Sequence, residues 1–149
     1  MKVTRWAAMV LLAFLGVSGI AGGVPMIADP GGRPIEMPQS LLQYSPFHSF
    51  LFPGIILLAA NGLLALWVLW MVFSRRNYYG WWTAIQGCVL LVWLVVECLM
   101  LRLVVWPHYL YGAVAAGLIA AGLALRREEA GSRGPRGAGS PRASQARTQ

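Results

Sequence analysis

The chain has 149 residues, of which 58% are hydrophobic and only 11% are charged, and its formal net charge is +7 at pH 7. Ordinary soluble domains are about 45–50% apolar and about 25% charged, so this composition excludes a typical water-soluble domain and favours an integral membrane protein. The basic residues lie beside apolar runs and in the C-terminal segment, where membrane topology accounts for them. We therefore expect the lipid bilayer, and not nucleic acid, as the partner of this charge.

Four apolar runs follow one another along the chain, at about residues 6–24, 51–73, 81–103 and 107–125. Each is close to the roughly 20 residues that a helix needs to cross a bilayer. Helices satisfy their own backbone hydrogen bonds in lipid, and no run alternates with period two as a membrane barrel requires. The sequence therefore predicts an all-α fold: a polytopic membrane protein with a four-transmembrane-helix bundle in one domain, residues 1–125.

The first run follows Lys2 and Arg5, and it has two interpretations. A short basic start, an apolar stretch and Gly19-Ile20-Ala21 resemble a signal peptide with a small-residue cleavage site. The run is long for a signal, however, and its glycines are spaced as helix-packing positions. We expect it to remain as a transmembrane helix; cleavage would leave three helices.

The longest predicted loop, residues 25–50, separates the first two runs. Its composition predicts turns rather than regular structure, because it contains Gly31-Gly32 and the prolines Pro25, Pro30, Pro34, Pro38 and Pro46. Asp29-Pro30-Gly31-Gly32 predicts a tight turn.

The last two runs are joined by a short connection, which predicts antiparallel neighbours. After Leu125 the chain becomes rich in arginine, glycine, serine and proline. We predict that residues 126–149 form a disordered basic tail, because this composition cannot bury a core. Electrostatic docking of the tail on anionic lipid is the alternative.

Orientation follows from the distribution of basic residues. With four helices, all of the 12 lysines and arginines except Arg33 and Arg102 fall on one side. The positive-inside rule makes that side cytoplasmic. We therefore expect a multi-pass protein of the cytoplasmic (plasma) membrane with both termini inside and the loop 25–50 outside.

Small residues recur at helical spacing in the first and fourth runs. Small side chains let helix backbones approach closely in lipid. These faces either pack within the chain or bind a membrane-protein partner or a second copy of it. The positions are Gly19 and Gly23 in the first run, and two rows in the fourth, Ala113, Gly117 and Ala121, and Gly112, Ala116 and Ala120.

Three polar residues at membrane depth form the candidate intramembrane site: Asn61, Gln86 and Glu97. A carboxylate in a membrane-spanning run is costly and is a functional hypothesis by default. Gln86 and Glu97 are eleven residues apart and so share one helix face, and Asn61 lies near the midplane of the preceding run. The competing interpretation is a neutral Glu97 that donates a hydrogen bond to a neighbouring helix.

A second group of candidate residues lies at the outer face: Asp29, His48, Arg102 and His108. Arg102 is five residues beyond Glu97, a poor spacing for an ion pair, and we expect it to extend into the outer interface. The spacing of the histidines and acids matches no metal-site motif, and nucleophile and nucleotide fingerprints are absent. We therefore assign no catalytic, metal or cofactor-binding residue, and expect no cofactor.

A set of short motifs occurs along residues 16–120: Gly19 with Gly22-Gly23, Asp29-Pro30-Gly31-Gly32, Met37-Pro38, the run Ser45-Pro46-Phe47-x-x-Phe50-Leu51-x-Pro53-Gly54, Asn61-Gly62, Gly87, and Trp93 followed by Glu97. Together these motifs resemble those of a loosely defined group of small bacterial four-helix integral membrane proteins of unknown function. The resemblance implies the fold, and a bacterial inner membrane, but no chemistry.

Three functions remain in view from the sequence. The first is a non-catalytic membrane scaffold or accessory subunit, since no enzyme motif is present. The second is a transporter or a proton- or ion-conducting component that uses Glu97. The third is a membrane enzyme with a site at the outer loop.

Overall fold

The computed structural model describes residues 2–33, 36, 39–43, 46–102 and 104–132. Across these ranges the regular structure is helical and contains no strand, which confirms the all-α prediction. Four helices of the described chain are long and apolar enough to cross a membrane. They are α1 (Lys2–Ala28), the continuous helix Leu51–Phe73, α4 (Tyr79–Leu101) and α5 (Trp106–Ser132).

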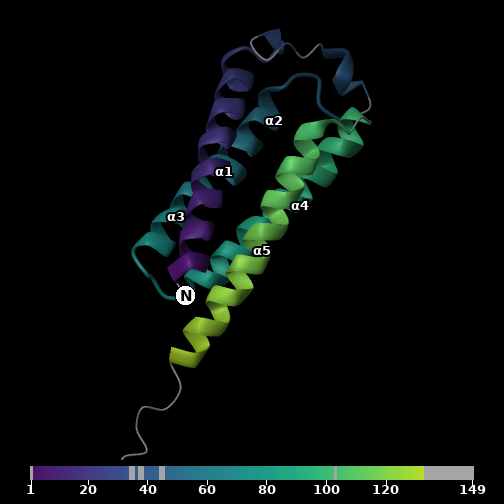
Figure 1. Cartoon of the computed structure of the whole chain (residues 1–149). Helices are drawn as coiled ribbons and strands as arrows, with labels where there is room; N and C mark the ends of the chain where they lie inside the picture. Colours follow the sequence, from purple (N-terminus) through teal and green to yellow (C-terminus); the bar gives the residue numbers. More distant parts are fainter. Residues whose placement is uncertain (1, 34–35, 37–38, 44–45, 103, 133–149) are drawn as a thin grey trace, which may run out of the picture.

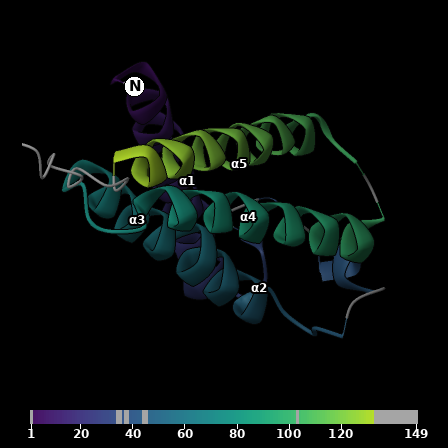
Figure 2. The ribbon, with the colours of Figure 1, turned by 90° about the horizontal axis from the view of Figure 1, so that it is seen from below.

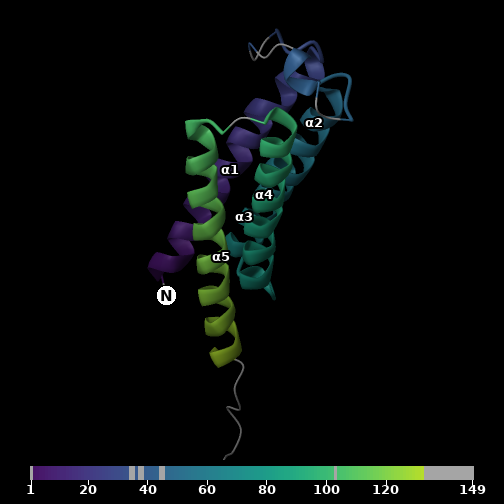
Figure 3. The same ribbon diagram turned by 90° about the vertical axis from the view of Figure 1, so that its right-hand side faces the viewer.

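The four long helices form two antiparallel pairs. The helix α1 packs along the whole of Leu51–Phe73, and α4 packs mainly against α5 (Figure 1). Contacts of α1 with α5, and of α3 with α4, join the pairs, and Figure 2 shows α4 between α5 and the helix that contains α2 and α3. One end of the bundle carries the N-terminus and the end of α5; we call it the terminal end, and the opposite end the loop end (Figures 1 and 3).

The helix Leu51–Phe73 has three parts. It begins as α2 (Leu51–Ile56), continues as a π-helical segment, η3 (Leu57–Leu63), and ends as α3 (Leu64–Phe73). In a π-helix the hydrogen bonds run to the fifth residue instead of the fourth, so the backbone carbonyls are offset from the α-helical ladder. This segment contains Asn61 and lies at the middle of the bundle.

Glycines allow the closest helix contacts. A Cβ atom added to Gly19 would lie 2.6 Å from the backbone carbon of Asn61, and one added to Gly23 would lie 2.9 Å from the carbonyl oxygen of Gly54. On the other pair, a Cβ at Gly87 would lie 2.8 Å from the oxygen of Ala115. The glycine row of α1 therefore faces the second helix, within the chain.

The core of the bundle is formed by aliphatic side chains from all four helices. The side chains of Leu12, Val68, Val72 and Leu118 are fully buried, and Leu90 is nearly so. They fill the space between the four helices.

Two helices extend beyond their predicted bounds. The helix α1 begins at Lys2 and continues through Pro25 to Ala28, and α5 continues to Ser132 rather than ending at Leu125. The predicted tail from residue 126 was therefore wrong for its first seven residues; residues 133–149 lie outside the described chain. The physical reason is that the ends of the helices were equated with the ends of the apolar runs, whereas arginine, glutamate and alanine at 126–130 are good helix formers.

The loop contains the predicted turn and one short helix. The backbone N–H of Gly32 donates to Asp29 O at 3.0 Å, which confirms the turn at Asp29-Pro30-Gly31-Gly32. A 3₁₀ segment, η2 (Gln39–Leu42), follows. Phe50 N–H donates to Pro30 O at 3.0 Å, and the buried side chains of Leu42 and Phe50 anchor the loop on the bundle near Glu97.

Candidate functional site

A partly enclosed cavity of about 140 Å³ lies between α1, η3 and α4 in the half of the bundle toward the loop end. Its polar lining comes from four helices: Ser18 on α1, Asn61 on η3, Glu97 on α4 and Tyr111 on α5. Four leucines supply most of the apolar wall, Leu15, Leu57, Leu90 and Leu94. At roughly 30 Å³ per molecule in liquid water, the cavity has room for about five waters.

Asn61 is fully buried at this cavity. Neither its Nδ2 nor its Oδ1 has a hydrogen-bond partner among the described residues. A buried amide without a partner costs about 1–3 kcal/mol, so the position is expensive unless the contents of the cavity complete its hydrogen bonds. The contact with Gly19 holds the backbone of Asn61 against α1 and so fixes where its side chain begins.

Glu97 faces His108 across the junction of α4 and α5. Its Oε2 lies 4.0 Å from Nε2 of His108, and the two side chains are 32% and 8% exposed respectively. The other ring nitrogen of His108, Nδ1, lies 3.2 Å from both the nitrogen and the oxygen of Val105, so its role depends on the tautomer. The pair therefore places an imidazole beside a carboxyl group that lines the cavity.

Gln86 binds the π-helical segment instead of lining the cavity. Its Nε2 donates to the carbonyl oxygen of Ala60 at 2.9 Å, directly before Asn61 in the chain. Gln86 and Glu97 lie on one stripe of α4, since the buried Leu90 and Leu94 fall between them at helical spacing. The amide of Gln86 thus ties α4 to the segment that carries Asn61.

None of the remaining candidates from the sequence lines the cavity; His108 lies beside Glu97, which does. Asp29 pairs with Arg33 at 2.8 Å and accepts a hydrogen bond from Gly31 N–H at 3.0 Å. His48 is exposed in the loop, and the exposed Arg102 ends α4 in a left-handed conformation with φ 47°. Within the described ranges, no three histidine, cysteine or acidic side chains are grouped to hold a metal ion.

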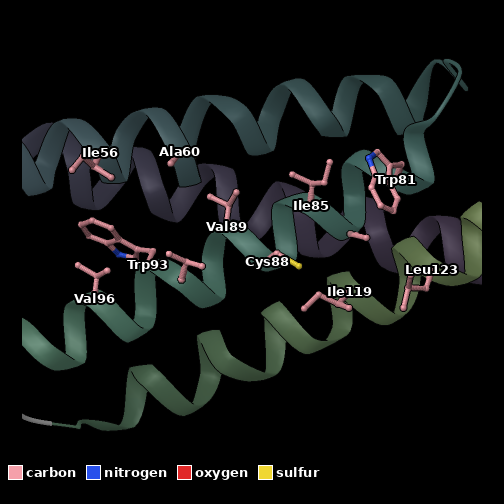
Figure 4. A pocket seen from close by; sticks show the side chains of 12 residues that line it. Ile56, Ala60, Trp81, Ile85, Cys88, Val89, Trp93, Val96, Ile119 and Leu123 are labelled. Atoms are coloured by element: carbon pink, nitrogen blue, oxygen red, sulfur yellow. The ribbon is translucent and has the colours of Figure 1, made fainter.

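A second hollow is a large apolar groove along α4, with a volume of about 690 Å³. Figure 4 shows α4 as its floor, the helix that contains α2 and η3 along one side, and α5 along the other. Ile56 and Ala60 form one rim, and Ile119 and Leu123 form the other. The floor includes the exposed thiol of Cys88. Trp93 borders both the groove and the cavity.

Ser18, Tyr111 and the groove were not identified from the sequence as parts of a site. Ser18 could have been found, because it is the only polar side chain in the apolar run 6–24. Tyr111 could not, because an aromatic residue near a helix end is common at any membrane interface. The groove depends on the spacing of three helices, which no local pattern contains.

Comparison of the chain with protein-family models, with curated proteins and with solved structures finds no match.

Proposed function

We propose that the chain is a multi-pass protein of a bacterial plasma membrane, with both termini in the cytoplasm. The four long apolar helices support membrane insertion. The charge distribution supports the orientation, because Lys2, Arg5 and Arg75 surround one hollow at the terminal end. At the same end, the guanidinium group of Arg126 lies over the ring of Trp81, 4.7 Å from its centre. Such a contact suits a cytoplasmic interface.

Within that membrane, we propose that the protein is a non-catalytic accessory subunit that binds a transmembrane helix of a partner protein. The groove on α4 carries this proposal. It extends from Trp81 to Val96, roughly 22 Å along the helix axis, which is most of the approximately 30 Å hydrocarbon core. The described residues that line it include no charged side chain, so an occupant must satisfy its own backbone hydrogen bonds, as a helix does.

The surface beside the groove favours a helix over a lipid chain. Ala113, Ala116 and Ala120 are exposed on α5 next to the groove residues Ile119 and Leu123. Small residues on an exposed helix face allow another backbone to approach closely, which is how helices associate without a hydrophobic driving force. A lipid chain gains nothing from such closeness.

A photo-reactive cross-linker on the native cysteines tests this proposal. Cys88 lies in the groove, whereas Cys98 is on the same helix but outside it, so the chain contains its own matched control. We expect the Cys98→Ser variant, labelled at Cys88, to form one defined protein adduct in native membranes, and the Cys88→Ser variant, labelled at Cys98, to form none. Lipid adducts alone at Cys88, or the same protein adducts from both positions, would refute the proposal.

A second candidate function, proton or cation conduction through Glu97, is favoured by one observation. Polar side chains follow one face of α4 from Tyr79, at the hollow of the terminal end, through the fully buried Thr83 to Gln86. Asn61 and Glu97 then continue the series to the loop end along the cavity. The fully buried core side chains beside this stripe mean that conduction would require the helices to move.

Proteoliposomes that contain the purified protein test conduction. If Glu97 carries the ion, the Glu97→Gln variant loses flux driven by a proton or cation gradient, while cross-linking from Cys88 stays unchanged. Equal flux in the variant and the original protein would reject this candidate.

A further inference from the structure

The cavity beside Asn61 presents more hydrogen-bond acceptors than the chain uses. Both amide atoms of Asn61, the acceptor Oδ1 and the donor Nδ2, are buried and have no partner among the described residues. The hydroxyl of Ser18 donates to Leu15 O at 3.1 Å, which leaves its own oxygen lone pairs as acceptors. Glu97 adds a carboxyl group to the lining. An occupant that donates several hydrogen bonds therefore complements this set.

The charge of the cavity lining also favours an ammonium-like occupant. Glu97 is the one residue with a formal charge among the described residues that line the cavity, and its Oε2 lies 4.0 Å from Nε2 of His108, which is outside that lining. An ion pair is stronger in a low-dielectric site than in water. The rings of Trp93 and Tyr111 also line the cavity, and aromatic rings attract cations. A positively charged occupant thus matches both the carboxyl and the rings.

The size and the apolar wall limit the occupant further. The volume of about 140 Å³ is close to the roughly 150 Å³ of an apolar cavity that holds a benzene molecule. A molecule of about six non-hydrogen atoms or fewer therefore fits. The leucine wall suits a short alkyl group, and a hydrated metal ion would leave that wall in contact with water.

We propose that this cavity binds a small primary alkylammonium ion. Its ammonium group donates hydrogen bonds to Glu97, to Oδ1 of Asn61 and to Ser18, and its alkyl group packs against Leu15, Leu57, Leu90 and Leu94. This ligand site is independent of the proposed accessory role, because binding in the cavity needs no partner helix in the groove. Binding here and cross-linking from Cys88 fail or succeed independently, so either result is informative by itself.

Ligand titration on the purified full chain in nanodiscs tests the proposal, with n-butylammonium as the probe. We expect saturable binding of butylammonium, and binding about tenfold or more weaker for n-butanol, which has the same shape but no charge. Tetramethylammonium, which lacks N–H donors, and sodium should also bind more weakly. Equal binding of butylammonium and butanol would overturn the proposal and indicate a cavity that holds water or any small apolar solute.

Variants connect the binding to these residues. Glu97→Gln should weaken butylammonium binding about tenfold or more, and Asn61→Leu should weaken it by removing the amide and filling the cavity. Glu129→Gln, a matched change near the far end of α5, should bind as the original chain does. Unchanged binding in Glu97→Gln would overturn the proposal. If that variant does not fold, the comparison of butylammonium with butanol on the original chain still decides the matter.

Discussion

At the scale of single residues, the polar side chains within the bundle have three distinct roles. Gln86 joins two helices through the carbonyl of Ala60, Asn61 borders a cavity with both of its amide atoms unpartnered among the described residues, and Glu97 faces His108. The identities of these residues as candidates came from the sequence, because polar side chains in apolar runs are costly. Their partners did not, since the acceptor of Gln86 is a backbone carbonyl of the π-helical segment, which no side-chain pattern identifies.

Loss of the Gln86 amide should destabilise the bundle. We expect Gln86→Leu to lower the free energy of unfolding by about 1 kcal/mol, the usual size of a hydrogen bond between membrane helices. Reversible unfolding in mixed detergent measures this change in the free energy of unfolding. Thr83→Val is the control, because the Thr83 hydroxyl donates only to Tyr79 O in its own helix, and it should cost less. An equal or larger loss in Thr83→Val would contradict the role of Gln86 as a tie between helices.

At the scale of elements, hydropathy located all four helices, since membrane-spanning helices must be long and apolar. The predicted ends of the helices were less accurate, because a helix can continue beyond its apolar run, as α5 does at 126–132. The π-helical segment could not be predicted, because nothing in the pattern of residues 57–63 marks it. The packing of α1 was partly predictable: its glycine spacing indicated close contact but not which helix would be contacted.

The glycine row of α1 gives a prediction at this scale. A Cβ at Gly19 would lie 2.6 Å from a backbone carbon of Asn61, and a backbone atom cannot move aside as a flexible side chain can. We expect Gly19→Val to cost about 1–3 kcal/mol of stability by overpacking. Gly112→Val is the matched control, since no atom lies within 4 Å of the added Cβ. The same unfolding assay compares the two, and equal stabilities would show that α1 does not pack on η3 as described.

At the scale of the whole molecule, the bundle has two different ends. The terminal end gathers Lys2, Arg5 and Arg75 around one hollow, and the loop end carries the turn at Asp29 and the cavity with Glu97. The sequence predicted the helical bundle, and its arginines predicted an orientation. It could not predict the groove or the cavity, because each is formed by residues from at least three helices.

The proposed orientation, with the loop end outside and the terminal end in the cytoplasm, is the central claim about the whole molecule. Single cysteines at Ser40 and at Gly131, both exposed, test it in a chain without Cys88 and Cys98. A membrane-impermeant maleimide applied to intact cells or spheroplasts should label the Ser40→Cys chain at once, and the Gly131→Cys chain only after the membrane is permeabilised. Labelling of both positions from outside, or of Gly131→Cys alone, would contradict the account.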